Sequence, residues 1–313
     1  MNLPESVTVV EVGPRDGLQS LERTYDTEVK ATMIERVLAA GVREVEATSF
    51  VHPKVVPQLA DAAALMGRLP RPPGVRYRGL VPNRKGAERA VAAGVDVVLG
   101  LISASETYSR RNQNMSIEEG LVTLGEVAEV AEAARLPWMA TISCAFFSPW
   151  EGATPAEHVL ALIERMLPLG PAEVSVASTA GMAGPGQVYR LCARIRREFP
   201  ELRLCVHLHN TNGMALPNAL AALQAGVAAL DASICGIGGG IVLPRTPGAG
   251  NVATEDLVSM LADLGVETGI DPEAIVRASR DVAALLELDR TGFTARAGTP
   301  TEVLARYARR ELS

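Results

Sequence analysis

Two histidines separated by a single residue are the strongest chemical signal in the chain. His207 and His209 are two of only four histidines among 313 residues. A mostly apolar run, 202–206, precedes them and a turn-forming run, 211–213, follows, which is typical of a buried strand that ends in a turn. Residues i and i+2 of a strand face the same side, roughly 6–7 Å apart. Both imidazoles can therefore reach one cation; the alternative is two histidines hydrogen-bonded within a core.

Other polar side chains follow other predicted strands. They are Arg15, Asp16, Glu46, Thr48, Ser49, Ser103, Ser105, Glu106, Ser143, Cys144, Ser178, Thr179, Asn210 and Asn251. One carboxylate, two imidazoles and an amide oxygen form a mixed nitrogen and oxygen ligand set that suits Mg²⁺ or Mn²⁺. Zn²⁺ is an alternative that the lack of an evident cysteine ligand disfavours. Each residue taken alone also has a structural interpretation. Asp16 can cap a turn, Glu46 can form a structural ion pair with Arg15, and the Asn251 amide can bond to backbone.

These residues depend for their positions on an alternation of strands and helices. Strands are predicted over 7–12, 44–48, 77–81, 95–102, 138–143, 173–177 and 229–234, together with the histidine strand. Each is followed by a helical pattern, and eight such units predict an α/β fold of the (β/α)8 TIM-barrel type. An open doubly wound sheet is the alternative, but no G-x-G-x-x-G run follows the first strand. A barrel gathers the carboxyl ends of all its strands, so their polar residues form one site.

The barrel is expected to span residues 1–270, with a helical appendage over 271–313 packed on it. The net charge of −6 gives no indication of nucleic-acid binding. No basic start followed by an apolar run suggests a signal peptide, and no apolar stretch is long enough to span a membrane. Four scattered cysteines without C-x-x-C spacing favour a reduced compartment. We therefore expect a cytoplasmic protein without nucleic-acid or membrane partners.

The run from Gly13 to Gln19, Gly-Pro-Arg-Asp-Gly-Leu-Gln, resembles the signature of 3-hydroxy-3-methylglutaryl-CoA lyases, members of the DRE-TIM metallolyases. The resemblance continues through 46–51, 103–106, 143–145, 207–209 and 250–251, and covers about residues 7 to 270. Related condensing enzymes usually differ at the positions of Pro14 and of Leu18-Gln19, so the motif is specific.

This resemblance implies a divalent cation, Mg²⁺ or Mn²⁺, held by Asp16, His207 and His209, with Asn251 completing or supporting the shell. It implies that Arg15 lies beside the thioester carbonyl oxygen of an acyl-CoA and that Glu46 lies near Arg15 and the cation. Arg15, Asp16, Glu46 and His207 are then the expected catalytic residues. The implied reaction is a retro-Claisen cleavage of hydroxymethylglutaryl-CoA to acetyl-CoA and acetoacetate, and we expect a homo-oligomer, a dimer or a tetramer.

Three departures from the family pattern bear on the substrate. The family places a cysteine in the loop after strand eight, where this chain has Gly240, and the following loop, 241–249, looks longer and contains Arg245. The family's acid after strand six is Ser178 here, and its aspartate after the second histidine is Asn210. Cys235 is a candidate replacement for the lost thiol; the alternative is a buried structural cysteine. The departures favour a related lyase or aldolase on a different acyl group, or a binding barrel of low turnover, as alternatives to the default substrate.

Overall fold

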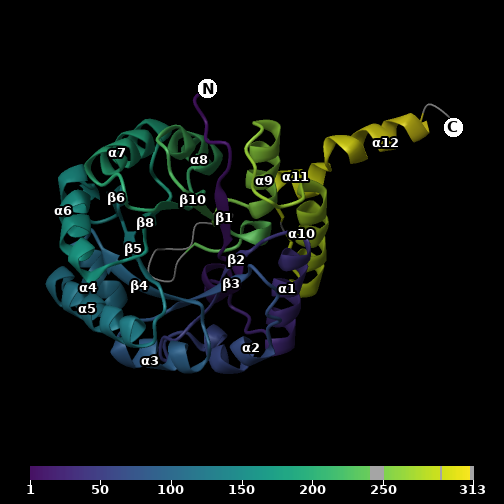
Figure 1. The fold of residues 1–313 in the computed structure, drawn as a ribbon. Coiled ribbons are helices and arrows are strands. Elements are labelled where there is room, and N and C mark those ends of the chain that lie inside the picture. The colour runs from purple at the N-terminus through teal and green to yellow at the C-terminus, as the bar shows by residue number, and fades with distance from the viewer. Residues whose placement is uncertain (240–249, 290, 311–313) are drawn as a thin grey trace.

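The computed structural model describes residues 1–239, 250–289 and 291–310, so Gly240 and Arg245 lie outside the described residues. Eight parallel strands close into a barrel with helices around it, which confirms the predicted α/β TIM barrel with extra C-terminal helices (Figure 1). The order around the barrel is β1-β10-β9-β8-β5-β4-β3-β2. These strands are β1 (Thr8–Glu11), β2 (Glu44–Ser49), β3 (Arg76–Leu80), β4 (Val97–Ser103), β5 (Trp138–Ser143), β8 (Glu173–Ser178), β9 (Leu204–Leu208) and β10 (Ala229–Ala232).

The helices that surround the barrel follow the strands in chain order. They are α1 (Thr27–Ala39), α2 (Ala62–Arg68), α3 (Arg84–Ala92), α4 (Glu106–Gln113), α5 (Ile117–Ala133), α6 (Ala156–Met166), α7 (Pro185–Glu198), α8 (Ala215–Gln224) and α9 (Thr254–Asp263). Their apolar sides and the outer faces of the strands form the main hydrophobic core. The run Ser116-Ile-Glu-Glu119 predicts a capping box, and the structure has it at the start of α5, where Ser116 and Glu119 bond reciprocally.

Short elements complete the chain. They are the single π-helical turn η1 (Gly13–Gly17), the 3-10 turns η2 (Pro57–Leu59), η3 (Leu167–Leu169) and η4 (Ile234–Gly236), and the hairpin β6 (Phe147–Ser148) and β7 (Gly152–Ala153). The sequence pattern after the second strand predicts one helix over 56–69, but the structure divides this segment into η2 and α2. The Gln58 carbonyl in η2 accepts a hydrogen bond from Lys30 Nζ at 2.6 Å.

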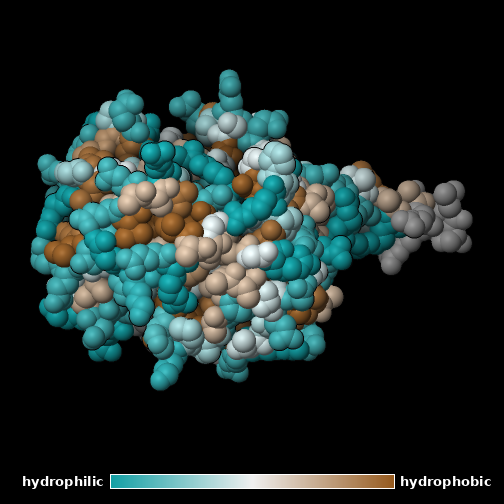
Figure 2. Space-filling view, turned by 60° about the horizontal axis from the view of Figure 1, so that its bottom comes forward, coloured by the Kyte–Doolittle hydropathy of each residue, from teal (hydrophilic) through white to brown (hydrophobic). Residues whose placement is uncertain are grey.

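Three helices follow the barrel: α10 (Pro272–Leu286), α11 (Phe293–Ala297) and α12 (Pro300–Arg310). Helix α10 packs against α1 and α9, whereas α12 projects from the body in Figure 1 and at the right of Figure 2. The face seen in Figure 2 is hydrophilic over much of its area, and hydrophobic residues gather in its left and central part. Within the described residues, no helix is long and apolar enough to cross a membrane. The domain division at residue 270 stays a prediction.

Candidate metal and acyl-CoA site

The turn after β1 places Asp16 at the carboxyl end of the barrel. Gly13 to Gly17 form one turn of π-helix, in which the backbone N–H groups of Asp16 and Gly17 both donate to the Val12 carbonyl. A Cβ atom on Gly13 would lie 2.6 Å from the Glu11 carboxylate, so this turn requires a glycine. The Glu11 carboxylate in turn accepts the Gly13 N–H at 2.7 Å and fixes the start of the turn.

The two histidines and Asp16 converge at one point. Strand β9 ends at Leu208, and His209 forms a bridge with Asn251 just beyond it. Asp16 Oδ2 lies 3.5 Å from His209 Nε2 and 4.0 Å from His207 Nε2, and one ligand atom from each of the three residues lies within 4.8 Å of the others. All three residues are buried, and no hydrogen bond satisfies His209 Nε2 within the described residues. A buried imidazole nitrogen without a partner, facing a carboxylate, is what a cation site requires.

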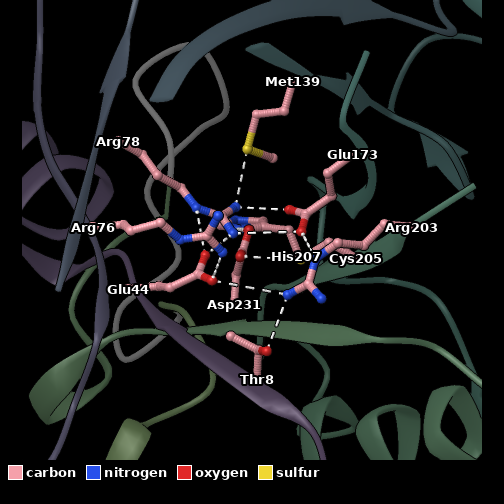
Figure 3. A network of polar contacts seen from close by, with 10 residues as sticks. All are labelled: Thr8, Glu44, Arg76, Arg78, Met139, Glu173, Arg203, Cys205, His207 and Asp231. Carbon is pink, nitrogen blue, oxygen red and sulfur yellow. Dashed lines mark hydrogen bonds and ion pairs between the residues drawn. The ribbon is translucent and has the colours of Figure 1, made fainter. Parts of the chain in front are cut away.

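Asp231 orients one of these histidines, and the sequence analysis missed it. Its Oδ2 lies 3.1 Å from His207 Nδ1, and the two residues pair in register across β10 and β9 (Figure 3). A histidine that donates Nδ1–H to a carboxylate presents Nε2 to a metal, an arrangement common around metal sites. The available signal was an aspartate, the only charged residue in an otherwise apolar strand.

The charges around Asp16 keep its carboxylate ionised. Burial raises the pKa of Asp16, but Arg15, His209 and His207 outweigh burial and hold that pKa well below its ordinary value. Burial lowers the pKa of His207, but its bond to Asp231 and the charge of Asp16 produce a net increase. Asp16 therefore offers an ionised carboxylate oxygen to a cation bound between the two histidines.

Arg15 lies beside this carboxylate and is held by two acids. Its Nη1 donates to Asp16 Oδ1 at 2.8 Å, and its Nε donates to Glu46. Arg15 and Glu46 thus form the ion pair that the sequence left open as a structural alternative. Burial raises the pKa of Glu46, while Arg15 lowers it in part. Within the described residues no hydrogen bond occupies Arg15 Nη2, so this nitrogen can donate to a ligand.

Asn251 touches the carboxylate rather than completing the triad. Its Nδ2 donates to Asp16 Oδ2 at 2.7 Å and to the Ile237 carbonyl at 3.0 Å. A Cβ atom on Gly238, whose φ is +133°, would lie 2.1 Å from Asn251 Nδ2, so a glycine is required for this close approach. Asn251 therefore supports Asp16 here, and its role as a metal ligand stays a prediction.

Several other candidate residues serve the fold instead. Ser105 accepts the Tyr108 N–H and caps α4, Glu106 accepts the Ile117 N–H, and Asn210 accepts the Ala215 N–H. Ser103 accepts the Ser105 N–H. These contacts fix the loops after β4 and β9, so these residues are not brought into the site.

The predicted strand over 229–234 would place Cys235 at a strand end, but the structure places it beyond that end. Strand β10 stops at Ala232 rather than Ile234, and Cys235 has a left-handed backbone with φ of 61°. Its Sγ lies 3.2 Å from the Ser279 carbonyl, and burial raises the pKa of the thiol. These contacts favour the interpretation of Cys235 as a buried structural cysteine.

A cavity of about 540 Å³ opens from the metal triad toward α3 and α4. Its floor is lined by Arg15, Asp16, Thr141, Ser143, Thr179, His207, His209 and Asp231. Four basic side chains line its outer part: His52, Lys85, Arg89 and Arg111. A cavity of this volume, polar at one end and cationic at the other, is suited to a long anionic ligand.

A buried ion network closes the opposite end of the barrel. Arg78 is 3% exposed and lies between two acids, donating to Glu173 Oε1 at 2.7 Å and to Glu44 (Figure 3). Cys205 Sγ lies 3.3 Å from Asp231 Oδ1, so Asp231 lies between this network and His207. Asp231 therefore lies between the Arg78 ion network at one end of the barrel and His207 of the metal triad at the other.

A protein-family model described as HMGL-like matches residues 6–282. The chain belongs to this family. It is 44% identical over 274 residues to the mitochondrial hydroxymethylglutaryl-CoA lyase of Gallus gallus, covering 87% of this chain and 91% of that protein. It is 45% identical over 270 residues to the cytoplasmic 3-hydroxy-3-methylglutaryl-CoA lyase of Danio rerio, covering 86% and 80%. The family confirms the resemblance read from the sequence.

Two solved structures share the whole architecture. The HMG-CoA lyase of Bacillus subtilis superposes with a TM-score of 0.91 at 37% identity, covering 95% of this chain and 99% of that chain. An HMG-CoA lyase of Acinetobacter baumannii, in complex with coenzyme A and 3-methylmalate, superposes with a TM-score of 0.90 at 36% identity, covering 95% and 96%. The relatives are carbon–carbon lyases, and the family together with the buried triad implies a divalent cation in this chain.

Proposed function

We propose that this protein is a divalent-cation-dependent carbon–carbon lyase that cleaves a 3-hydroxy-acyl-CoA. Hydroxymethylglutaryl-CoA, cleaved to acetyl-CoA and acetoacetate, is the default substrate because the most similar relatives quoted above are named for it. The observation that carries the proposal is the convergence of Asp16, His207 and His209 beside Arg15 at the floor of one cavity.

Asp16, His207 and His209 are the proposed ligands, with Asn251 completing or supporting the shell. The unpartnered His209 Nε2 and the strongly acidic Asp16 carboxylate support this assignment. Nitrogen and oxygen donors without a thiol favour Mg²⁺ or Mn²⁺. When bound, the cation supplies Lewis-acid polarisation of the hydroxyl and carbonyl oxygens of the substrate.

Arg15 is the proposed partner of the thioester oxygen. Breaking the carbon–carbon bond moves an electron pair onto the thioester as an enolate, and negative charge develops on its oxygen. The Arg15 guanidinium is preorganised by Glu46 and Asp16, so it reaches this oxygen without reorganising. Glu46, whose burial raises its pKa, lies on the other side of Arg15 and is the proposed acid–base group nearest to it.

The coenzyme A portion is proposed to lie along the cationic part of the cavity. Lys85 and Arg111 line its outer end, opposite the triad, where the phosphates of an acyl-CoA would need positive charge. The complex of the Acinetobacter baumannii relative with coenzyme A supports an acyl-CoA substrate for this chain.

The test is a screen of the purified protein with Mg²⁺ against hydroxymethylglutaryl-CoA and a panel of other 3-hydroxy-acyl-CoAs, followed by the masses of the products. We expect one substrate to be split into an acyl-CoA and a keto product, and we expect the Arg15→Lys variant to lose this cleavage while it keeps its fold. Binding of acyl-CoA without cleavage of any panel member would contradict a lyase and leave the low-turnover binding barrel.

A different acyl group is the second candidate. The Acinetobacter baumannii relative was solved with 3-methylmalate, a smaller hydroxy acid than hydroxymethylglutarate. The small side chains that line the cavity, such as Ala177 and Thr141, do not indicate which acyl group it accepts. The panel should therefore include malyl-type thioesters, and a higher kcat/KM on one of them than on hydroxymethylglutaryl-CoA decides for this candidate.

The compartment and assembly are further proposals. The four cysteines are unpaired and buried, which agrees with a reducing cytoplasm. We propose a homo-oligomer, a dimer or a tetramer, without nucleic-acid or membrane partners. Light scattering of the purified protein measures the assembly, and a monomer at micromolar concentration would contradict it.

A further inference from the structure

The proposed cleavage leaves a chemical requirement that the triad and Arg15 do not meet. The thioester enolate must receive a proton on carbon before it becomes a product, so a proton donor must face the substrate. Among the lining residues that the structure describes, the uncharged hydroxyl groups belong to Thr141, Ser143, Thr179 and Tyr108. Tyr108 has the only phenol among them, with an ordinary pKa near 10. Aliphatic hydroxyls are far weaker acids than a phenol, and burial raises the pKa of both kinds of group, so the phenol stays the stronger acid of the four.

Tyr108 is held firmly at the edge of the cavity. It lies in the first turn of α4, where the Ser105 hydroxyl accepts its backbone N–H at 3.1 Å. Its side chain is 6% exposed, and its ring centroid lies 6.1 Å from that of Trp150. Arg111 covers the Trp150 ring at 5.2 Å. This packing restricts the movement of the Tyr108 ring, which lines the cavity.

The Tyr108 hydroxyl belongs to the electrostatic environment of the site. Burial raises its pKa, the nearby Cys144 thiol and Asp16 carboxylate raise it further, and Arg15 lowers it in part. The phenol therefore keeps its proton at neutral pH and holds it in the cavity that contains Asp16 and Arg15.

We propose that Tyr108 is the catalytic residue that protonates the enolate. The Tyr108 O–H bond breaks, the enolate electron pair forms a C–H bond with that proton, and the phenolate remains. The proton that first left the tertiary hydroxyl of the substrate returns to the phenolate through the base that removed it. The proton count closes without another reactant. This assignment rests on the proposed lyase function.

The test compares wild-type protein with Tyr108→Phe, which keeps the ring and removes the hydroxyl. We expect kcat to fall by about 10²–10⁴-fold, with little change in KM and with the Mn²⁺ affinity, measured by calorimetry, unchanged. Because bond cleavage still occurs and reverses, labelled keto product should exchange into the substrate faster relative to net turnover than in the wild type. Tyr25→Phe is the matched control, since that phenol donates to the Leu286 carbonyl outside the cavity, and its kcat should match the wild type.

Three results would overturn the assignment. A Tyr108→Phe variant with near-normal kcat would show that another group donates the proton. Loss of Mn²⁺ affinity together with kcat would show a structural role. Equal loss of exchange and of net turnover would place Tyr108 in the cleavage step instead. A wild type that cleaves no acyl-CoA would refute the lyase function and this role together, which distinguishes that failure from the other three.

Discussion

Replacing Asp231 by asparagine tests how the barrel interior prepares the metal site. The substitution keeps the size of the side chain but removes the charge that faces His207 Nδ1 at 3.1 Å. Two arrangements are then available. If the amide oxygen faces Nδ1, the hydrogen bond survives without its charge. If the amide NH₂ faces Nδ1, His207 carries its proton on Nε2 and cannot bind the cation.

The structure sets the size of this effect. Asp231 is 6% exposed and its other oxygen is bonded to Cys205, so little water can replace the lost charge. Mutation of a carboxylate that hydrogen-bonds to a metal-ligating histidine typically lowers metal affinity by about 10–100-fold, which is about 1.4–2.7 kcal/mol of binding free energy. We expect Asp231→Asn to weaken Mn²⁺ binding by this factor while the circular dichroism spectrum stays that of the wild type.

Calorimetric titration of metal-free protein with Mn²⁺ measures this factor directly. Cys205→Ala is the matched control, because it removes the other hydrogen bond to Asp231 and leaves the contact with His207 in place. Its Mn²⁺ affinity should match the wild type. An Asp231→Asn variant with wild-type affinity would refute the view that Asp231 orients His207, and equal losses in both variants would point to a general disturbance of the barrel.

Three further predictions follow from buried charges. Arg15→Lys should keep fold and metal affinity but lose about 10²–10³-fold in kcat, because an ammonium cannot copy the fork of donors; near-normal turnover would refute its role. Burial raises the Glu11 pKa from 4.5 to about 7. The native state therefore binds this proton more tightly than the unfolded chain, and denaturant titrations should show stability falling by on the order of 3 kcal/mol between pH 4.5 and about 7. Glu11→Gln should remove that fall, and an unchanged pH profile in the variant would contradict it. Arg78→Met should cost about 3–5 kcal/mol, because two buried glutamates lose their partner; the exposed Arg68→Met is the control, expected to cost at most about 1 kcal/mol, and equal costs would contradict the argument.

The barrel could be predicted because its strands repeat a strong local signal. The strand over 138–143 was predicted with the bounds that the structure has, and the others differ at their ends by a few residues. Helix α4 was missed because its charged sequence, Glu106–Gln113, has little apolar periodicity and its start depends on the Ser105 cap. Helix α11 and the β6–β7 hairpin are too short to give a periodic pattern.

The site was predictable where neighbours in sequence are neighbours in space. Strand geometry sufficed to place His207 and His209 together, and barrel topology sufficed to bring Asp16 to them. Asp231 was missed because its contact with His207 depends on the register between two strands, which no local pattern specifies. Tyr108 was missed because it lies in a helix that was not expected, so nothing indicated that its ring would line the cavity.

The measurement that tests the central claim most directly is a titration of Mn²⁺ into chelator-treated protein, with bound metal and acyl-CoA cleavage followed together. We predict that turnover of the best panel substrate rises in proportion to occupancy and saturates at one ion per chain. We predict that His209→Ala, which removes the unpartnered nitrogen, needs far more Mn²⁺ to reach any turnover. Full turnover in the metal-free protein, or unchanged metal content in both His207→Ala and His209→Ala, would contradict a metal-dependent lyase built on this triad.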